Sequence, residues 1–122
     1  MWRIQSSVDF QKRLKKYRKS HPNESANCLR NLNAYLTALQ EGLVPQQIQR
    51  GYVHSEPNGI KALDQAGPSK TRKYAMRLYV YPDESRKILY VLTLGNKASQ
   101  PDDLRHCQEF VKQTLADDSS GW

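Results

Sequence analysis

The fold is decided by residues 74–97, which read YAMRLYVYPDESRKILYVLTLGNK. Tyr74–Tyr81 alternates as a strand does, because successive side chains of a strand point to opposite faces. One face would carry Tyr74, Met76, Leu78 and Val80, and the other Ala75, Arg77, Tyr79 and Tyr81. Ile88–Leu94 is apolar on both faces, which is typical of a central strand. The short connection Pro82–Ser85 predicts that the two strands pair antiparallel.

Upstream of this hairpin, the sequence begins with a short strand and a helix. Trp2–Gln5 alternates apolar and polar residues, and Ser6 or Ser7 offers an N-cap for a helix that runs to about Ser20. The apolar stripe expected on this helix consists of Val8, Phe10, Leu14 and Tyr17. His21-Pro22-Asn23 ends the helix.

A second helix has the clearest periodicity in the chain, and Gly42 stands near its end. Its expected buried stripe consists of Leu29, Leu32, Leu36, Leu39 and Leu43. Val44–Asn58 is rich in Pro, Gln and Gly, so we expect a connection there, with one helical turn at Pro45–Gln49. Ile60–Leu63 predicts a short strand, and Gly67-Pro68-Ser69 predicts a loop.

A third helix follows the hairpin. Gly95-Asn96 ends the strand, and Ser99-Gln100-Pro101-Asp102 has the cap, the early proline and the first-turn carboxylate of a helix start. Its expected buried stripe consists of Leu104, Cys107, Val111 and Leu115. These elements predict an α+β fold, in which two N-terminal helices and a C-terminal helix pack on a small, mostly antiparallel sheet. We expect one domain over residues 1–116 and a flexible tail over residues 117–122.

The composition indicates a polyanionic partner. The chain has 122 residues and a net charge of +7, with a pI near 9.5, a balance that favours phosphate backbones or acidic surfaces. No stretch approaches the roughly twenty apolar residues of a membrane span, and the N-terminus lacks the apolar segment of a secretory signal. We therefore expect a cytoplasmic protein. Cys28 and Cys107 are expected to be buried thiols, too few for a cysteine-based zinc site.

The basic residues fall into a helical cluster and a loop cluster. The helical cluster consists of Lys12, Lys15, Lys16 and Lys19, which share one helix face where they can meet phosphates. The alternative is an ordinary solvated face, although no acidic residue lies between Phe10 and Pro22 to offset the repulsion. The loop cluster consists of Lys70, Arg72 and Lys73, which would add positive potential beside the sheet.

Arg77 shares a strand face with Tyr79 and Tyr81, so it is a candidate for binding a phosphate while bases stack beside it. The alternative is a structural cation that pairs with a carboxylate or lies over a tyrosine. Lys97 directly follows a strand end, where a loop can place a side chain accurately. Lys61 alternates with apolar neighbours and is expected to point away from the core.

Acid–base and metal chemistry have little support in the sequence. His21, His54 and His106 are candidate proton-transfer groups, but their spacing forms no metal motif. Asp102-Asp103 is interpreted as a pair of helix-start carboxylates. The sequence also lacks a phosphate-cradling glycine loop and a nucleophile elbow.

Four local motifs resemble those of the RelE/ParE superfamily of bacterial toxin–antitoxin systems, which includes the HigB-like toxins. NGIKAL at residues 58–63 is similar to the family's second strand, and YAMRLYVY at residues 74–81 to its "yRl.y.y" strand. LTLGNK at residues 92–97 is similar to the strand that ends in a basic turn, and DDLRHC at residues 102–107 to the start of the closing helix. The resemblance covers nearly the whole chain.

This resemblance implies a ribosome-dependent endoribonuclease that a cognate antitoxin neutralises. It would cut mRNA without a metal or other cofactor, by attack of a ribose 2′-hydroxyl on the adjacent phosphate. Arg77 would hold the scissile phosphate, Lys97 would neutralise the charge that develops, and Lys61 would act as base or anchor. The chain departs from the family pattern at Leu104, where studied members carry a tyrosine, and His106 or Arg105 is a candidate substitute.

A second departure is that Lys97 stands alone where the family has a fuller basic cluster. Relatives that poison gyrase share the fold without cutting RNA, so the fold does not decide the activity. The main alternative is a non-enzymatic nucleic-acid-binding module, in which Tyr79, Tyr81 and the first helix bind RNA or DNA. A weaker alternative is a protein-interaction domain whose charge serves an acidic partner.

Overall fold

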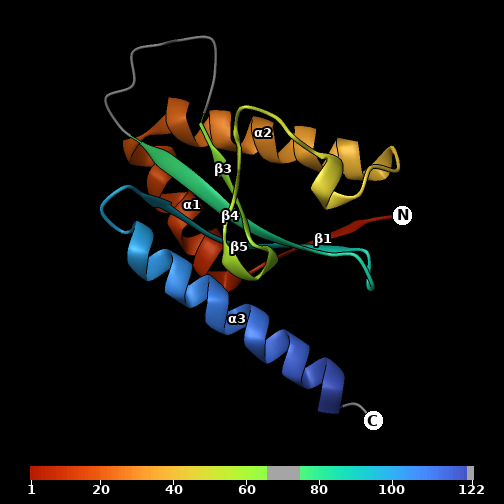
Figure 1. Ribbon diagram of the computed structural model, residues 1–122. Helices are drawn as coiled ribbons and strands as arrows, with labels where there is room; N and C mark the ends of the chain where they lie inside the picture. The colour runs from red at the N-terminus through yellow and green to blue at the C-terminus, as the bar shows by residue number, and fades with distance from the viewer. Residues whose placement is uncertain (66–74, 121–122) are drawn as a thin grey trace.

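The computed structural model describes residues 1–65 and 75–120, with the side chains of the last helix described up to residue 114. A five-stranded sheet has the order β1-β5-β4-β3-β2, and Figure 1 shows it between helical layers. The strands are β1 Arg3–Ser6, β2 Val53–Ser55, β3 Lys61–Asp64, β4 Met76–Asp83 and β5 Ile88–Asn96. The α-helices in this part of the chain are α1 Val8–Ser20, α2 Pro22–Gln40 and α3 Gln100–Ser120. The α+β architecture predicted from the sequence is confirmed.

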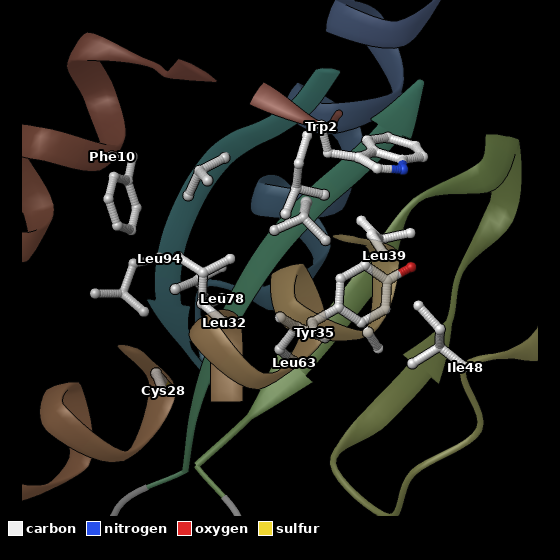
Figure 2. Packing of buried hydrophobic residues seen from close by; sticks show 14 of the residues in the cluster. Trp2, Phe10, Cys28, Leu32, Tyr35, Leu39, Ile48, Leu63, Leu78 and Leu94 are labelled. Atoms are coloured by element: carbon white, nitrogen blue, oxygen red, sulfur yellow. The ribbon is translucent and has the colours of Figure 1, made fainter. Parts of the chain in front are cut away.

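Two apolar clusters lie on opposite faces of the sheet. On one face, Phe10 of α1 and Leu32 and Leu39 of α2 pack against Leu78 and Leu94, as Figure 2 shows. On the other face, residues of α3 pack against a second set that consists of Ile60, Ala62, Tyr79, Ile88, Tyr90 and Leu92. The strands β3, β4 and β5 therefore bury side chains on both faces, which explains why residues 88–92 of β5 are all apolar.

The β4–β5 hairpin is antiparallel, as expected, and β5 lies between β4 and β1. β4 runs two residues further than predicted, because Pro82 and Asp83 still pair with Leu89 and Ile88. The turn follows at residues 84–87, and Lys87 has a positive φ of 56°. The register shifts at Tyr79/Val80, where Tyr79 pairs with Thr93 and Val80 with Val91, so Leu92 is an extra residue on β5. The alternation of faces continues on β4, whereas on β5 Leu92 and Leu94 belong to opposite clusters.

The outer strands differ more from expectation. β1 pairs parallel with β5, a direction that no sequence pattern predicted. β2 lies inside the segment expected to be a connection, and it pairs antiparallel with β3 at the edge of the sheet. A strand of three residues is too short to show a period, so only its pairing partner defines it. The helical turn expected nearby is confirmed at Pro45–Gln47.

The side of α2 that is buried in the structure differs from the leucine stripe that the sequence predicted to be buried. Cys28, Leu32, Tyr35 and Leu39 are buried, whereas Leu29, Leu36 and Leu43 are partly buried at its border. Val8, the first residue of α1, is exposed, against expectation. On α3, Cys107 and Val111 are buried as predicted and Leu104 is partly buried, and the Leu115 side chain lies outside the described part. α3 continues to Ser120, past the expected start of the tail, whose flexibility stays a prediction.

The cysteines are buried, as predicted, and neither forms a disulfide. Burial raises the pKa of the Cys28 and Cys107 thiols to about 12, so neither is a ready nucleophile. No helix in the described ranges is both long enough and apolar enough to cross a bilayer.

Ser7 caps α1, because its Oγ accepts a hydrogen bond of 3.0 Å from the Phe10 amide. The same hydroxyl donates to the Leu92 carbonyl at 2.6 Å, so the cap also ties α1 to β5. We expect Ser7→Ala to lower the free energy of unfolding by about 1–2 kcal/mol, measured by urea denaturation. Ser6→Ala is the matched control, since the Ser6 hydroxyl only accepts an exposed bond from Gln11. Equal stability of the two variants would contradict the capping role.

Candidate nucleic-acid interface

A basic pocket lies at one end of the β4–β5 hairpin. The register places Met76 opposite Asn96 and Arg77 opposite Gly95. Ala75, directly before β4, and Lys97, directly after β5, therefore lie at the same end of the hairpin. Arg77, Lys97, Ala75 and Gln100 line a pocket of about 240 Å³. We name this the Arg77–Lys97 pocket. The sequence predicted each cation separately, and the hairpin brings them together.

Arg77 is half-buried. Within residues 1–65 and 75–114, its guanidinium makes no hydrogen bond or ion pair. The carboxylate opposite it on β3 belongs to Asp64, which contacts His54 Nε2 at 2.8 Å. In the described part of the chain, Arg77 therefore does not fit the alternative of a structural cation paired with a carboxylate. A guanidinium without a protein partner is suited to bind an external phosphate.

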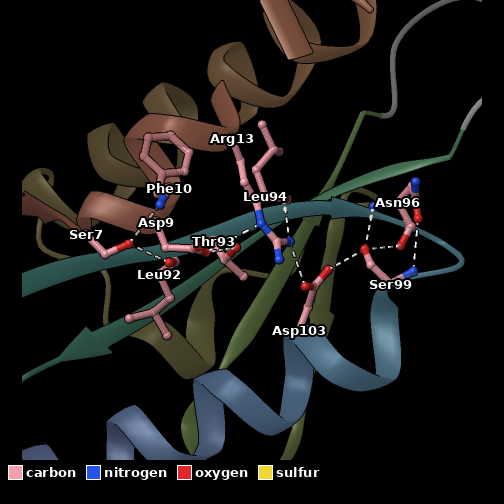
Figure 3. A network of polar contacts seen from close by, with 10 residues as sticks. All are labelled: Ser7, Asp9, Phe10, Arg13, Leu92, Thr93, Leu94, Asn96, Ser99 and Asp103. Atoms are coloured by element: carbon pink, nitrogen blue, oxygen red, sulfur yellow. Dashed lines mark hydrogen bonds and ion pairs between the residues drawn. The ribbon is translucent and has the colours of Figure 1, made fainter. Parts of the chain in front are cut away.

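The turn that carries Lys97 is held by a polar network, which Figure 3 shows. The Ser99 amide donates to Asn96 Oδ1 at 2.9 Å, and the Asn96 amide donates to Ser99 Oγ at 3.1 Å. Ser99 Oγ donates to Asp103 Oδ2 at 2.7 Å. Arg13 Nη1 of α1 donates to Asp103 Oδ1 at 2.7 Å. The network therefore connects α1, the turn after β5 and α3.

The same network covers an open edge of β5. β1 pairs with β5 only as far as Val91, and the carbonyls beyond it accept bonds from α1 instead. Ser7 Oγ donates to Leu92, and Arg13 Nη1 donates to Leu94 at 3.1 Å. Unpaired strand edges are prone to pair with other chains, so these bonds also protect the edge.

Asp102 and Asp103 both lie in the first turn of α3, as expected of helix-start carboxylates, and the Asp102 side chain is exposed. The sequence interpretation did not foresee the environment of Asp103. Asp103 is only 3% exposed and forms an ion pair with Arg13. Although burial alone would lower the pKa of Arg13, its hydrogen bond to Asp103 and the charge of that carboxylate raise it. No local sequence signal marks this pair, because its members lie on different helices.

Gly95 is required beside this network. A Cβ built on Gly95 would collide with the Asp103 carboxylate and lie 2.5 Å from Ser99 Oγ. Since both side chains are held by hydrogen bonds, they cannot easily move away. Glycine at this position therefore lets α3 start close against β5.

The four lysines of the first helix share one exposed face, as predicted. Together with Ser20 they line a shallow hollow, and the four are Lys12, Lys15, Lys16 and Lys19. We name this set the α1 lysine face. α1 runs beside β5 in the same direction, since Ser7 contacts Leu92 and Arg13 contacts Leu94. The last turn of α1 therefore points toward the end of the sheet that holds the Arg77–Lys97 pocket.

The predicted role of Tyr79 in base stacking is wrong, whereas that of Tyr81 stays a prediction. Tyr79 is 0% exposed, because α3 covers this face of the sheet. Tyr81 is half-buried, and its ring stacks on Tyr90 with the centroids 6.3 Å apart. The alternation of β4 correctly grouped these tyrosines with Arg77, but alternation alone cannot show which face a later helix covers. Tyr79 is unavailable to stack on a base in this arrangement.

Lys61 and His106 do not join the pocket. Lys61 lies opposite Val80, its Nζ donates to Ser55 Oγ at 2.9 Å, and it lines a different pocket of about 330 Å³. His106 is exposed on α3. Neither is therefore placed to act with Arg77 and Lys97. The loop cations Lys70, Arg72 and Lys73 lie outside the described residues.

The remaining histidines have structural contacts. His21 lies between α1 and α2, with its ring 6.1 Å from that of Tyr17. His54 contacts Asp64. Among the described residues, no cluster of three or more His, Cys, Asp or Glu side chains is arranged to hold a metal ion.

The described site thus consists of a small pocket with two cations and a separate lysine face on α1, whose last turn points toward the same end of the sheet (Figure 1). Together they are a candidate anion-binding surface. In comparisons with known proteins, no family model, curated protein or solved structure matches the chain.

Proposed function

We propose that the chain is a toxin-like, metal-independent endoribonuclease that cuts mRNA on the ribosome and is neutralised by a cognate antitoxin. One observation carries the proposal. Arg77 on β4 and Lys97 in the turn after β5 line one pocket, and the Arg77 guanidinium makes no hydrogen bond or ion pair with the described residues. Two adjacent cations suit a bridging phosphate, because each can donate to a different oxygen.

The proposed reaction is an internal transfer of the phosphate. The ribose 2′-oxygen bonds to phosphorus while the bond to the 5′-oxygen breaks, and the proton that the 2′-hydroxyl loses is balanced by one that the 5′-oxygen gains. The products are a 2′,3′-cyclic phosphate and a 5′-hydroxyl. Arg77 would hold the phosphate, and Lys97 would offset the negative charge that grows on its oxygens.

The α1 lysine face would grip RNA next to the scissile phosphate. Its four lysines are exposed, and Arg13 ties α1 to the turn that carries Lys97 through Asp103. Contacts between lysines and phosphates add affinity without reading sequence. In this proposal the α1 lysine face positions the RNA, and the Arg77–Lys97 pocket carries out the reaction.

A non-catalytic nucleic-acid-binding module is the second candidate. The observation that favours it is the composition of the Arg77–Lys97 pocket, whose described lining includes no histidine or carboxylate to accept a proton. Lys61 and His106, the candidate proton acceptors, lie elsewhere. RNA that is bound but left intact would support this reading.

Expression in bacteria tests the proposed function. We expect the unaltered chain to arrest growth and to fragment mRNA, and we expect Arg77→Ala to restore growth because the phosphate loses its main ligand. Arg30→Ala is the matched control, since Arg30 is an exposed arginine on α2 and does not line the pocket. Normal growth with the unaltered chain at the same protein level would contradict the ribonuclease proposal.

The α1 lysine face predicts a salt dependence. Replacing Lys12 and Lys16 with alanine is expected to reduce the slope of log K against log[salt] for single-stranded RNA by about 1.4, because each lost phosphate contact changes the slope by about 0.7. Fluorescence anisotropy over a salt series measures this slope. The control carries Arg105→Ala and Lys112→Ala, which lower the net charge equally on exposed positions of α3. Identical slopes for the two variants would exclude a specific role for α1.

A further inference from the structure

Lys97 is positioned by its turn. Its side chain is exposed and makes no hydrogen bond or ion pair with the described residues. The turn around it is closed by the reciprocal bonds between Asn96 and Ser99. The location of the Lys97 backbone, and with it the region that the ammonium group can reach, therefore depends on what holds Ser99.

Ser99 is held by a buried carboxylate. Its hydroxyl donates to Asp103 Oδ2, while Arg13 occupies Asp103 Oδ1. Asp103 is almost fully buried, and Gly95 lies against both Asp103 and Ser99. The carboxylate thus has one well-defined position, with a charged donor on one oxygen and the turn on the other (Figure 3).

We propose that Asp103 is a positioning residue for Lys97, which acts through Ser99 to fix the 96–99 turn and to keep the Lys97 ammonium group beside Arg77. Arg13 contributes by compensating the charge of Asp103, so that this buried carboxylate does not offset the positive pocket. This inference rests on the proposed binding of an RNA phosphate in the Arg77–Lys97 pocket. It adds a link from α1 to the pocket that the proposed function does not require.

A double-mutant cycle between Ser99→Ala and Lys97→Ala separates positioning from simple structural support. The ligand is a labelled single-stranded oligonucleotide with 2′-O-methyl riboses, which cannot undergo attack by a 2′-hydroxyl. We expect Ser99→Ala to weaken binding about fivefold, a coupling of the size seen within one hydrogen-bond network. In the Lys97→Ala background, the same change is expected to leave the affinity unaltered, because there is no ammonium group left to position.

The neighbouring carboxylates of α3 supply a second, matched comparison. Asp103→Asn is expected to weaken binding in a chain that retains Lys97, whereas Asp102→Asn is expected to have no effect, since among the described residues Asp102 pairs with the exposed Arg105. Urea denaturation of each variant identifies the conditions under which all are folded, and affinities are compared there. A loss from Asp103→Asn that persists unchanged without Lys97 would assign Asp103 a structural role alone.

The outcomes distinguish this inference from the proposed function. If the double variant loses affinity by the product of the two single losses, Ser99 and Lys97 act independently, and this result would overturn the positioning role. Affinity that depends on Arg77 and Lys97 but not on Ser99 would overturn it while leaving the phosphate site intact. Affinity unchanged in both Arg77→Ala and Lys97→Ala would overturn the proposed phosphate site itself.

Discussion

Alanine at both Arg77 and Lys97 is expected to weaken the binding of single-stranded RNA by about two orders of magnitude. A hydrogen bond to a charged group contributes about 1.5 kcal/mol or more, so two of them amount to about 3 kcal/mol, and each 1.4 kcal/mol is tenfold in affinity. Both cations line one pocket. Anisotropy with the 2′-O-methyl oligonucleotide measures the effect without interference from cleavage.

The control for this variant removes the same charge from another surface. Arg105→Ala with Lys112→Ala lowers the net charge equally, and both positions are exposed on α3. We expect that variant to change the affinity only slightly, through the general field of the protein. If the two variants bind equally weakly, overall charge explains the binding and the Arg77–Lys97 pocket has no special role.

Removing the Arg13 side chain is expected to lower the free energy of unfolding by about 2–3 kcal/mol. The change leaves Asp103 buried without its cationic partner and removes the donor to the Leu94 carbonyl. Breaking a fully buried pair in this way costs about 3–5 kcal/mol. We expect less, because the Arg13 side chain is 36% exposed and water can partly replace it.

Urea denaturation of Arg13→Ala tests this expectation, and Arg105→Ala is the matched control. Arg105 pairs with Asp102, and both side chains are largely exposed, so its loss is expected to cost less than about 1 kcal/mol. A variant that lacks both Arg13 and Asp103 should lose less than the sum of the single losses, since neither charge is then left unpaired. Equal stability of Arg13→Ala and Arg105→Ala would show that the pair contributes little.

The sequence predicted the elements with a strong period. β4 and β5 alternate or are largely apolar over eight and nine residues, and Ser7 at the start of α1 is a recognisable cap. β2 was missed because three residues show no period. The parallel pairing of β1 with β5 was not predicted, because the residues of a strand do not show in which direction its partner runs.

The candidate site was predicted unevenly for a physical reason. Strand alternation grouped Arg77 with Tyr79 and Tyr81, yet α3 covers the face and buries Tyr79. The burial of Asp103 likewise depends on Arg13 of another helix. Burial of a polar side chain is set by contacts between distant segments, which periodicity in one segment does not report.

The most direct test of the proposed function is the chemistry of the RNA ends. Translating ribosomes are incubated with the purified chain, and the mRNA 3′ ends are mapped by methods specific for 2′,3′-cyclic phosphate. We expect the unaltered chain to generate such ends within coding sequence and Arg77→Ala to generate almost none, because Arg77 would hold the phosphate under attack. Intact mRNA with the unaltered, RNA-binding chain would contradict the proposal and favour a binding module.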